Sequence, residues 1–236
     1  MNLREDPSQV RIVQSADEWT PKYIDVVAII FVASLLISNI ASSKLFDLGP
    51  ATFTAGILVF PICYIFGDIL TEVYGFRRTR RIIYLGFLAN AFMVGVLWVA
   101  IKLPPAEGWP FQKEFATVHA LLPRLVLGSL IAYLLGELTN SIIMSRLKLF
   151  TKGKLLWVRT ISSTVAGQFV DTFVFAFVAF GGVLQNELLI KLSLWGWMFK
   201  VLYEAVVTPF TYLIVGKLKK WEGIEHFDTK DRIRLF

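Results

Sequence analysis

Residues 60–81 read FPICYIFGDILTEVYGFRRTRR, and the prediction of the fold starts from them. An apolar run ends there at Gly75 and is followed by four arginines, as expected where a membrane helix leaves the bilayer. Short cytoplasmic loops carry an excess of Lys and Arg, so this loop is predicted to be cytoplasmic. Asp68 and Glu72 lie four residues apart and therefore on one helical face. A carboxylate near hydrocarbon is costly unless it faces a partner or water, so these two acids need an explanation.

The composition is that of an integral membrane protein, because 56% of the 236 residues are hydrophobic. The net charge of +6 is also found in nucleic-acid-binding proteins. Here, however, Lys and Arg cluster in short segments between apolar runs, which is the pattern of charges that set membrane topology. We therefore predict a lipid bilayer and no nucleic acid as partners. The single cysteine, Cys63, lies inside an apolar run, so no disulfide framework is expected.

Six apolar segments are long enough to span a bilayer, which takes about 20 residues. They are predicted at residues 23–43, 51–74, 82–101, 121–144, 157–181 and 192–218. The expected fold is an all-α membrane protein, a bundle of six transmembrane helices. We predict one membrane domain over residues 23–218, a cytoplasmic N-terminal segment over 1–22 and a cytoplasmic C-terminal tail over 219–236.

The orientation follows from the basic residues outside these spans. Eighteen Lys and Arg residues fall on the side that holds both termini, and four fall on the other side. The four are Lys44, Lys102, Lys113 and Lys191. Both termini are therefore predicted to be cytoplasmic.

Four of the predicted spans carry a polar pair at helical spacing, so that each pair projects from one face of its helix. The pairs are Asp68 with Glu72, Glu137 with Asn140, Gln168 with Asp171, and Lys200 with Glu204. Asn39 and Arg124 add polar groups toward the outer ends of the first and fourth spans. The predicted spans contain five acidic residues but only two basic ones, so ion pairs alone cannot neutralise all of the acids. Such acids are protonated, bind a cation, line water or accept hydrogen bonds from a ligand rich in donors.

Structural explanations remain open for these features. A buried ion pair of Lys200 with Glu204 or Asp171 would hold helices together without binding anything. A stripe of small residues between polar ends is formed by Arg124, Gly128, Ala132, Gly136 and Asn140, and it is about 24 Å long. Its usual meaning is tight helix packing, within the chain or in a homodimer, and the alternative is a smooth wall of a substrate cleft.

Enzyme motifs are missing from the sequence, which contains no Walker loop, no Rossmann fingerprint, no GxSxG and no HExxH. We expect no catalytic residue, no cofactor and no metal. The alternative from a different class is an intramembrane enzyme that uses Asp68 and Glu72 as an acid–base or metal-binding pair. Without a histidine or further clustered acids nearby in the sequence, that pair is a weak metal site.

Four segments in order resemble the queuosine precursor transporter family, also called the vitamin uptake transporter family. They are FPICYIFGDILTEVYG followed by RRTRR (60–81), PRLVLGSLIAYLLGELTN (123–140), GQFVDTFVFAFVAF (167–180) and FKVLYEAVVTP (199–209). The resemblance implies import of a 7-deazaguanine base across the inner membrane for tRNA modification. The base would be 7-cyano-7-deazaguanine, 7-aminomethyl-7-deazaguanine or queuine. The implied fold is a six-helix bundle similar to the substrate-binding components of energy-coupling-factor vitamin importers.

The resemblance also implies substrate-binding positions, which are Asp68, Arg124, Asn140, Gln168, Asp171 and Lys200. Three further candidates, Glu72, Glu137 and Glu204, stand where the family varies, and Asn39 is a candidate by its position in a span. A guanine-like base presents adjacent N–H donors and a carbonyl on one edge. The carboxylate of Asp171 is expected to accept from the donors, while the amide of Gln168 or Asn140 pairs with the carbonyl. Phe173, Phe175 and Phe177 offer aromatic surface, although residues two apart on a helix cannot all share one face.

The leading hypothesis is a secondary importer of this small-molecule substrate. Coupling of uptake to protons through an excess acid, Asp171 or Glu204, is a further hypothesis. The alternative is a binding module that depends on a partner ATPase. The AxxxA pattern at which such partners dock is missing from the first span, where Ala28 and Ala33 are five residues apart.

Overall fold

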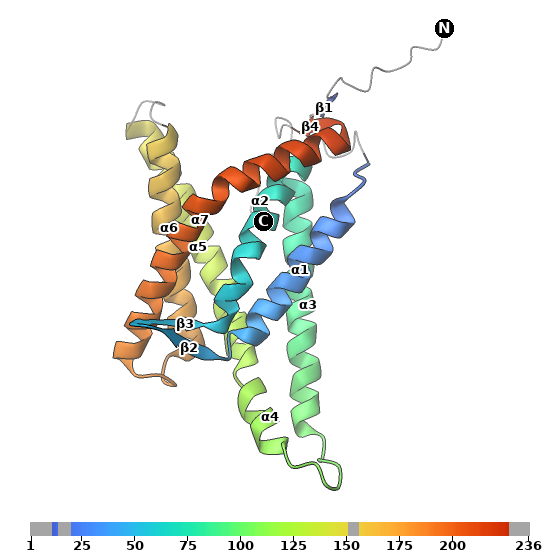
Figure 1. The fold of residues 1–236 in the computed structure, drawn as a ribbon, viewed down its shortest axis with the longest axis vertical. Coiled ribbons are helices and arrows are strands. Elements are labelled where there is room, and N and C mark those ends of the chain that lie inside the picture. Colours follow the sequence, from blue (N-terminus) through green and yellow to red (C-terminus); the bar gives the residue numbers. More distant parts are fainter. Residues whose placement is uncertain (1–10, 14–19, 151–155, 227–236) are drawn as a thin grey trace. The chain divides into compact units, whose positions relative to one another are not determined.

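The computed structural model describes residues 11–13, 20–150 and 156–226, and its elements are labelled in Figure 1. In chain order they are β1 (Arg11–Val13), α1 (Ile24–Ala41), β2 (Leu45–Leu48), β3 (Ala51–Thr54), the 3-10 helix η2 (Ala55–Leu58), α2 (Phe60–Tyr74), α3 (Phe76–Lys102), α4 (Gln112–His119), α5 (Leu122–Phe150), α6 (Leu156–Phe180), α7 (Asn186–Glu222) and β4 (Ile224–His226). Five helical segments of this part of the chain are long and apolar enough to cross a membrane: Ile24–Ala41, Arg77–Lys102, Gln112–Asn140, Ile161–Phe180 and Asn186–Glu222. These elements agree with the predicted all-α membrane protein.

The predicted helix over residues 51–74 is wrong at its beginning. Its first residues form β3, the second strand of a β-hairpin with β2, and then η2, and α2 begins only at Phe60. The register pairs Leu45 with Thr54, Phe46 with Phe53, Asp47 with Thr52 and Leu48 with Ala51. Gly49 forms the turn with a φ of 60°, a conformation that glycine adopts without strain. With 15 residues, α2 is about 22 Å long, which is shorter than a hydrocarbon core of about 30 Å.

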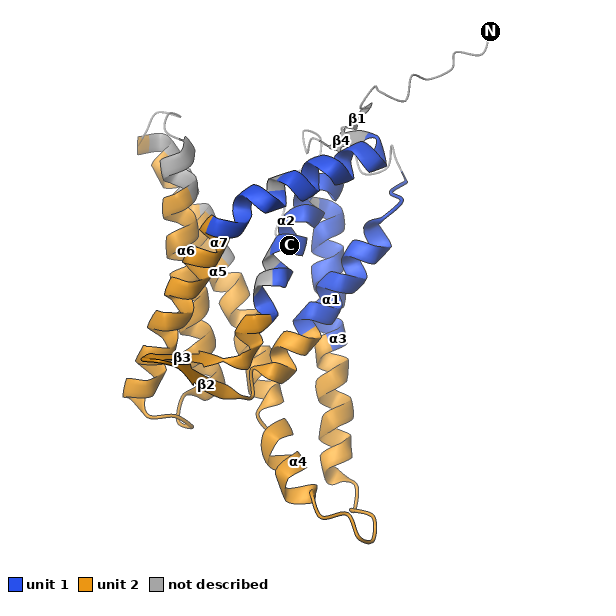
Figure 2. Cartoon of the chain, viewed as in Figure 1, with its two compact units in different colours: residues 1–35, 59–89, 206–236 blue, residues 36–58, 90–205 orange. Residues whose placement is uncertain are grey.

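The chain divides into two compact units, which are coloured separately in Figure 2. Unit 1 consists of Met1–Leu35, Val59–Ala89 and Val206–Phe236, and unit 2 of Leu36–Leu58 and Asn90–Ala205. The strands β1 and β4 pair in parallel within unit 1. Large apolar side chains such as Ile29, Phe92 and Leu202 are exposed on the helices, as expected where helices face lipid.

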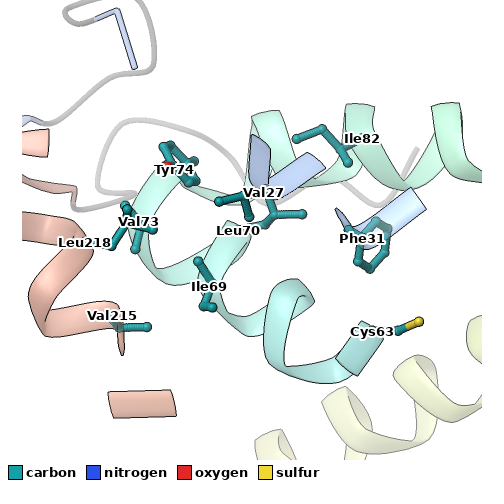
Figure 3. Close-up of a cluster of buried hydrophobic side chains, with 10 residues drawn as sticks. All are labelled: Val27, Phe31, Cys63, Ile69, Leu70, Val73, Tyr74, Ile82, Val215 and Leu218. Atoms are coloured by element: carbon teal, nitrogen blue, oxygen red, sulfur yellow. The ribbon is translucent and has the colours of Figure 1, made fainter. Parts of the chain in front are cut away.

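The core of unit 1 is an apolar cluster that draws side chains from α1, α2, α3 and α7 (Figure 3). Its buried members are Val27, Phe31, Cys63, Ile69, Leu70, Val73, Tyr74, Ile82, Val215 and Leu218. On α2, Ile69 with Val73 and Leu70 with Tyr74 are each four residues apart, so these members share one apolar face of the helix. Cys63 is a free, buried thiol in this cluster, where it packs as a small apolar side chain.

Among its described residues, unit 2 has two apolar clusters. The first joins α5, α6 and α7 through Leu122, Leu125, Ala176, Ala179, Phe180, Leu189 and Leu192. The second packs the β2–β3 hairpin on α7, and there Phe53 meets Phe199 edge to face with ring centroids 5.8 Å apart. The hairpin is therefore held in unit 2 by aromatic contacts with α7.

The stripe of small residues on α5 packs against α6 within the chain. A Cβ atom added to Gly128 would lie 3.3 Å from the backbone nitrogen of Ala179, and one added to Gly136 would lie 2.9 Å from Cβ of Asp171. Any larger side chain at these positions would push the two helices apart. The prediction of tight packing within the chain is confirmed, and a homodimer through this stripe would have to displace α6.

Candidate substrate-binding site

Polar side chains of α6 and α7 meet inside unit 2. Gln168 and Asp171 are three residues apart on α6, and Lys200 and Glu204 are four apart on α7, so each pair shares a helical face. Lys200 Nζ lies 2.7 Å from Asp171 Oδ2, and the two side chains are only 11% and 13% exposed. Gln168 donates a hydrogen bond from Nε2 to Glu204 Oε2 over 3.4 Å. The contacts that connect these antiparallel helices thus include an ion pair and a long amide–carboxylate hydrogen bond.

Asn140 of α5 and Asp171 of α6 lie at the same helix–helix contact. A Cβ atom on Gly136 would be 2.9 Å from Cβ of Asp171, and one on Gly167 would be 3.0 Å from Cβ of Asn140. Each polar side chain therefore sits over a glycine of the opposite helix, one helical turn from the other. Asn140 Oδ1 is buried and has no hydrogen-bond partner among the described residues. A buried polar atom without a partner costs about 1–3 kcal/mol, so this oxygen is available to accept a hydrogen bond from a ligand or from water.

Thr172 provides a second such oxygen, which the sequence-based prediction missed. The residue is 6% exposed, and its Oγ1 is buried without a hydrogen-bond partner in the described part of the chain. Its methyl carbon faces α7, 3.3 Å from where Gly196 would carry a Cβ atom. A helical threonine usually bonds to the carbonyl four residues earlier, so the sequence held no signal that this hydroxyl would be left over.

Aromatic rings follow another face of α6, which lies roughly opposite Asp171 around the helix. Phe169 and Phe173 have centroids 4.2 Å apart, and Phe173 stacks on Phe177 at 6.5 Å. Phe169 also meets Trp197 of α7 edge to face at 5.5 Å, and the Trp197 indole donates to the carbonyl of Val165. Phe175 points elsewhere and packs in the apolar cluster of α5, α6 and α7, against Phe180. The expectation that Phe173, Phe175 and Phe177 do not all share one face of the helix is therefore confirmed.

Arg124 and Asn39 have partners of their own in unit 2. Arg124 Nη2 donates to the carbonyls of Val178 and Gly181, at 3.1 and 2.7 Å, where α6 ends. This arrangement caps the free carbonyls of α6 and places a positive charge at the negative end of its dipole. Asn39 Nδ2 donates to Oδ1 of a buried asparagine that the sequence-based prediction missed, Asn90, over 2.8 Å. The side chain of Glu137 lies outside the described part of the structure.

The acids of α2 belong to unit 1. Glu72 Oε1 accepts a hydrogen bond from Lys219 Nζ over 2.7 Å, and Asp68 has an exposed side chain. Among the described residues, no group of three or more His, Cys, Asp or Glu side chains is placed to hold a metal ion. The structure therefore gives Glu72 a partner at the end of α7, and it shows no cluster of further ligands around the two acids in the described region.

Glu222 is a buried carboxylate of unit 1 that the prediction did not single out. It is 4% exposed, and it accepts hydrogen bonds from the backbone nitrogens of Lys22 and Tyr23 and from Tyr74 Oη, at distances between 2.9 and 3.2 Å. The carboxylate thereby caps the start of α1 and ties it to the ends of α2 and α7. No local motif reveals this role, because the partners lie 148 to 200 residues away in the chain.

Comparison with known proteins identifies one matching family and three related proteins. The family described as "Putative vitamin uptake transporter" matches residues 54–214. A "Probable queuosine precursor transporter" of Bacillus subtilis (strain 168) is 27% identical over 176 residues, which cover 74% of this chain and 77% of the relative. A second "Probable queuosine precursor transporter", from Haemophilus influenzae (strain ATCC 51907 / DSM 11121 / KW20 / Rd), is 28% identical over 127 residues, which cover 54% of this chain and 52% of the relative.

A third relative, the "Queuosine precursor transporter" of Escherichia coli (strain K12), is 26% identical over 156 residues, which cover 65% of this chain and 68% of the relative. No solved structure matches the chain. The polar residues that meet between α5, α6 and α7 all fall within the matched residues 54–214, whereas Asn39 and Glu222 fall outside them.

Proposed function

Because the chain belongs to the vitamin uptake transporter family, we propose that it imports queuosine precursors, which are 7-deazaguanine bases, across the cytoplasmic membrane. The family is one of transporters, so the chain is not an enzyme, and the alternative of an intramembrane enzyme at Asp68 and Glu72 is set aside. Apolar helices long enough to cross a membrane are consistent with this activity.

The observation that carries the proposal is the polar cluster of Asn140, Gln168, Asp171, Lys200 and Glu204, contributed by three helices of unit 2. Polar and ionisable groups inside a membrane domain mark substrate pathways, because hydrocarbon gives them no other partner. We place the N–H edge of the base at the carboxylate of Asp171, which Lys200 holds when no substrate is bound. The ammonium of Lys200, or the amide of Gln168, then donates to the carbonyl of the base.

Of the aromatic rings on α6, only Phe169 is proposed to contact the base, because it meets Trp197 of α7 edge to face on the side where the two helices meet. Phe177 is 45% exposed and lies on the far side of the helix from Asp171, so we assign it to lipid. Stacking of a base on an aromatic side chain contributes about 1–3 kcal/mol. Because stacking tolerates different substituents on the base, Phe169 would support affinity for the whole class of bases, and the polar groups would discriminate between its members.

The topology proposed for transport keeps both termini in the cytoplasm. It counts α2 as a sixth crossing of one membrane domain over residues 23–218, flanked by the segments 1–22 and 219–236. The excess of Lys and Arg on the side of the termini supports this orientation. Asp68, at the cytoplasmic end of α2 in this topology, is proposed as a contact on the inner part of the substrate path.

Uptake by cells that cannot synthesise 7-deazaguanines tests the site. With labelled base, Asp171→Asn is expected to lower uptake by about 30-fold or more, the effect of losing one partner of a buried charge pair. Asp25→Asn, on the exposed face of α1, is the matched control and should leave uptake unchanged. Uptake at the wild-type rate in Asp171→Asn would remove that residue from the site.

Purified protein in liposomes tests the secondary mechanism. Accumulation of labelled base without ATP or any other protein is the expected result. Binding of the base without accumulation would instead favour a module that depends on a partner ATPase.

A further inference from the structure

The side chain of Thr172 lies where α6 meets α7. Thr172 is 6% exposed and follows Gln168 on α6 by one helical turn, so the two residues share a helical face. The methyl carbon of Thr172 lies 3.3 Å from where Gly196 of α7 would carry a Cβ atom. Gln168 reaches α7 as well, because its amide donates to Glu204. Thr172 therefore belongs to the face of α6 that packs against α7.

The hydroxyl group of Thr172 is buried and has no hydrogen-bond partner among the described residues. A threonine inside a helix usually donates to the carbonyl oxygen four residues earlier. Five other threonines of the described helices make this bond: Thr71, Thr79, Thr117, Thr139 and Thr211. Because buried polar groups nearly always have a partner, we expect this hydroxyl group to find its partner in a molecule that enters from outside the chain.

A guanine-like base carries one more donor than the proposed contact with Asp171 uses. Its Watson–Crick edge has a ring N–H and an amino group with two N–H bonds. Two parallel hydrogen bonds to the Asp171 carboxylate use the ring N–H and one amino N–H. The second amino N–H points away from that carboxylate and needs another acceptor. A hydroxyl group can accept it, and the hydroxyl proton can then go to the ring nitrogen beside the amino group.

We propose that Thr172 is a substrate-binding residue whose hydroxyl oxygen accepts a hydrogen bond from the amino group of the base. The inference rests on the proposed function and adds to it a residue that recognises this amino group. Thr172 follows Asp171 in the chain, so its side chain leaves α6 about 100° further round the helix, on the side of α7. Because Oγ1 is buried, the base reaches it only when side chains at the α6–α7 contact move. That movement breaks no hydrogen bond of this hydroxyl group to a described residue, and the base then supplies one.

Thr172→Val tests the assignment, because it removes the hydroxyl group and keeps the shape of the side chain. The purified full-length wild type and variant are each titrated with 7-cyano-7-deazaguanine and with its analogue that lacks the 2-amino group. The variant should bind the amino-bearing base about tenfold more weakly than the wild type does, because one amino N–H is left unpaired. Both proteins should bind the analogue with equal affinity. Thr172→Ser keeps the hydroxyl group and should keep the wild-type ratio between the two bases.

Three results would contradict the assignment to Thr172. Equal weakening of both bases in Thr172→Val, or a changed ratio in Thr172→Ser, would mean that the hydroxyl group does not contact the amino group. No weakening of either base would leave Asn140 Oδ1, the other buried oxygen without a partner among the described residues, as the acceptor. Binding of neither base by the wild type would count against the proposed function itself, and the assignment would fail with it.

Thermal unfolding of the same proteins provides an independent measurement. Thr172→Val removes a buried polar group without breaking a hydrogen bond, so its melting temperature should equal or exceed that of the wild type. Thr79→Val is the matched control, because Thr79 is 3% exposed and its Oγ1 donates to the carbonyl of Gly75 over 2.9 Å. The control should unfold at a lower temperature and bind both bases as the wild type does. A lower melting temperature in Thr172→Val would show that its hydroxyl group already has a partner in the folded protein, and would overturn the proposal.

Discussion

Two ion pairs of the same length stand in very different surroundings. Lys200 with Asp171 in unit 2 and Lys219 with Glu72 in unit 1 are both 2.7 Å long. The first pair has side chains 11% and 13% exposed, whereas Glu72 in the second is 59% exposed. An exposed carboxylate keeps its water when its partner leaves, and a buried one does not. The distance between charges therefore says little about what a pair does, and the surroundings of each charge decide it.

The buried carboxylates of the two units differ in a second way. Glu222 in unit 1 receives three donors, from Lys22, Tyr23 and Tyr74, and it caps a helix. In unit 2, by contrast, the Asp171 carboxylate pairs with the ammonium of Lys200, and two buried oxygens nearby have no hydrogen-bond partner among the described residues. A buried carboxylate whose oxygens all receive hydrogen bonds stabilises the fold. A region with buried acceptor oxygens that lack donors is suited to bind a ligand that carries donors.

The largest effect is expected from Lys200→Met, because it leaves the buried Asp171 carboxylate without its cation. Removing one partner of a buried ion pair costs about 3–5 kcal/mol in the free energy of unfolding. Adding Asp171→Asn should restore most of this stability, since no charge is then unpaired, but should not restore uptake. Unfolding in mixed detergent micelles and uptake per folded molecule measure the two quantities. Recovery of uptake in the double variant would show that the pair is structural only.

A smaller effect on stability is expected from Glu222→Gln, with no loss of transport. The amide offers one acceptor oxygen to three donors, which should cost about 2–3 kcal/mol. Uptake per folded molecule should stay at the wild-type level, because the residue serves unit 1. Glu114→Gln, exposed in α4, is the control and should change neither quantity. A transport defect without a stability defect would mean that this carboxylate belongs to the substrate path.

The sequence predicts those features that depend on local pattern. Long apolar runs indicated the positions of α1, α3, α5, α6 and α7, and the stripe of small residues every fourth position predicted close packing of α5, although only the structure identifies α6 as its partner. The hairpin before α2 was missed, because short apolar runs do not distinguish strand from helix, and here aromatic contacts with Phe199 help to hold the strands. The roles of Glu222 and Thr172 could not be predicted either. Glu222 bonds to residues that are distant in the sequence, and the Thr172 hydroxyl is left without a partner among the described residues only because of how the helices pack.

The stripe of small residues gives the next effect in size. Gly136→Ala places a carbon 2.9 Å from Cβ of Asp171, so the helices must separate or Asp171 must move, at about 1–2 kcal/mol. Uptake should fall as well, because Asp171 is displaced from Lys200. Gly95→Ala on α3 is the matched control, since a Cβ atom there meets nothing within 4 Å. The control should be neutral or up to about 1 kcal/mol more stable, because alanine favours a helix. Equal melting temperatures for both variants would contradict the close contact of α5 and α6.

The smallest effect is expected from Lys219→Met, which removes the cation of the exposed pair in unit 1. Its partner Glu72 is 59% exposed and stays solvated, so the free energy of unfolding should change by less than about 1 kcal/mol. Because salt screens exposed charges, even this difference should shrink when the ionic strength is raised from 0.01 to about 0.15 M. Uptake should be unchanged, and Glu72→Gln should behave in the same way. A loss as large as that of Lys200→Met would mean that burial does not distinguish the two pairs, and the assignment of Asp171 to the substrate would then lose its physical basis.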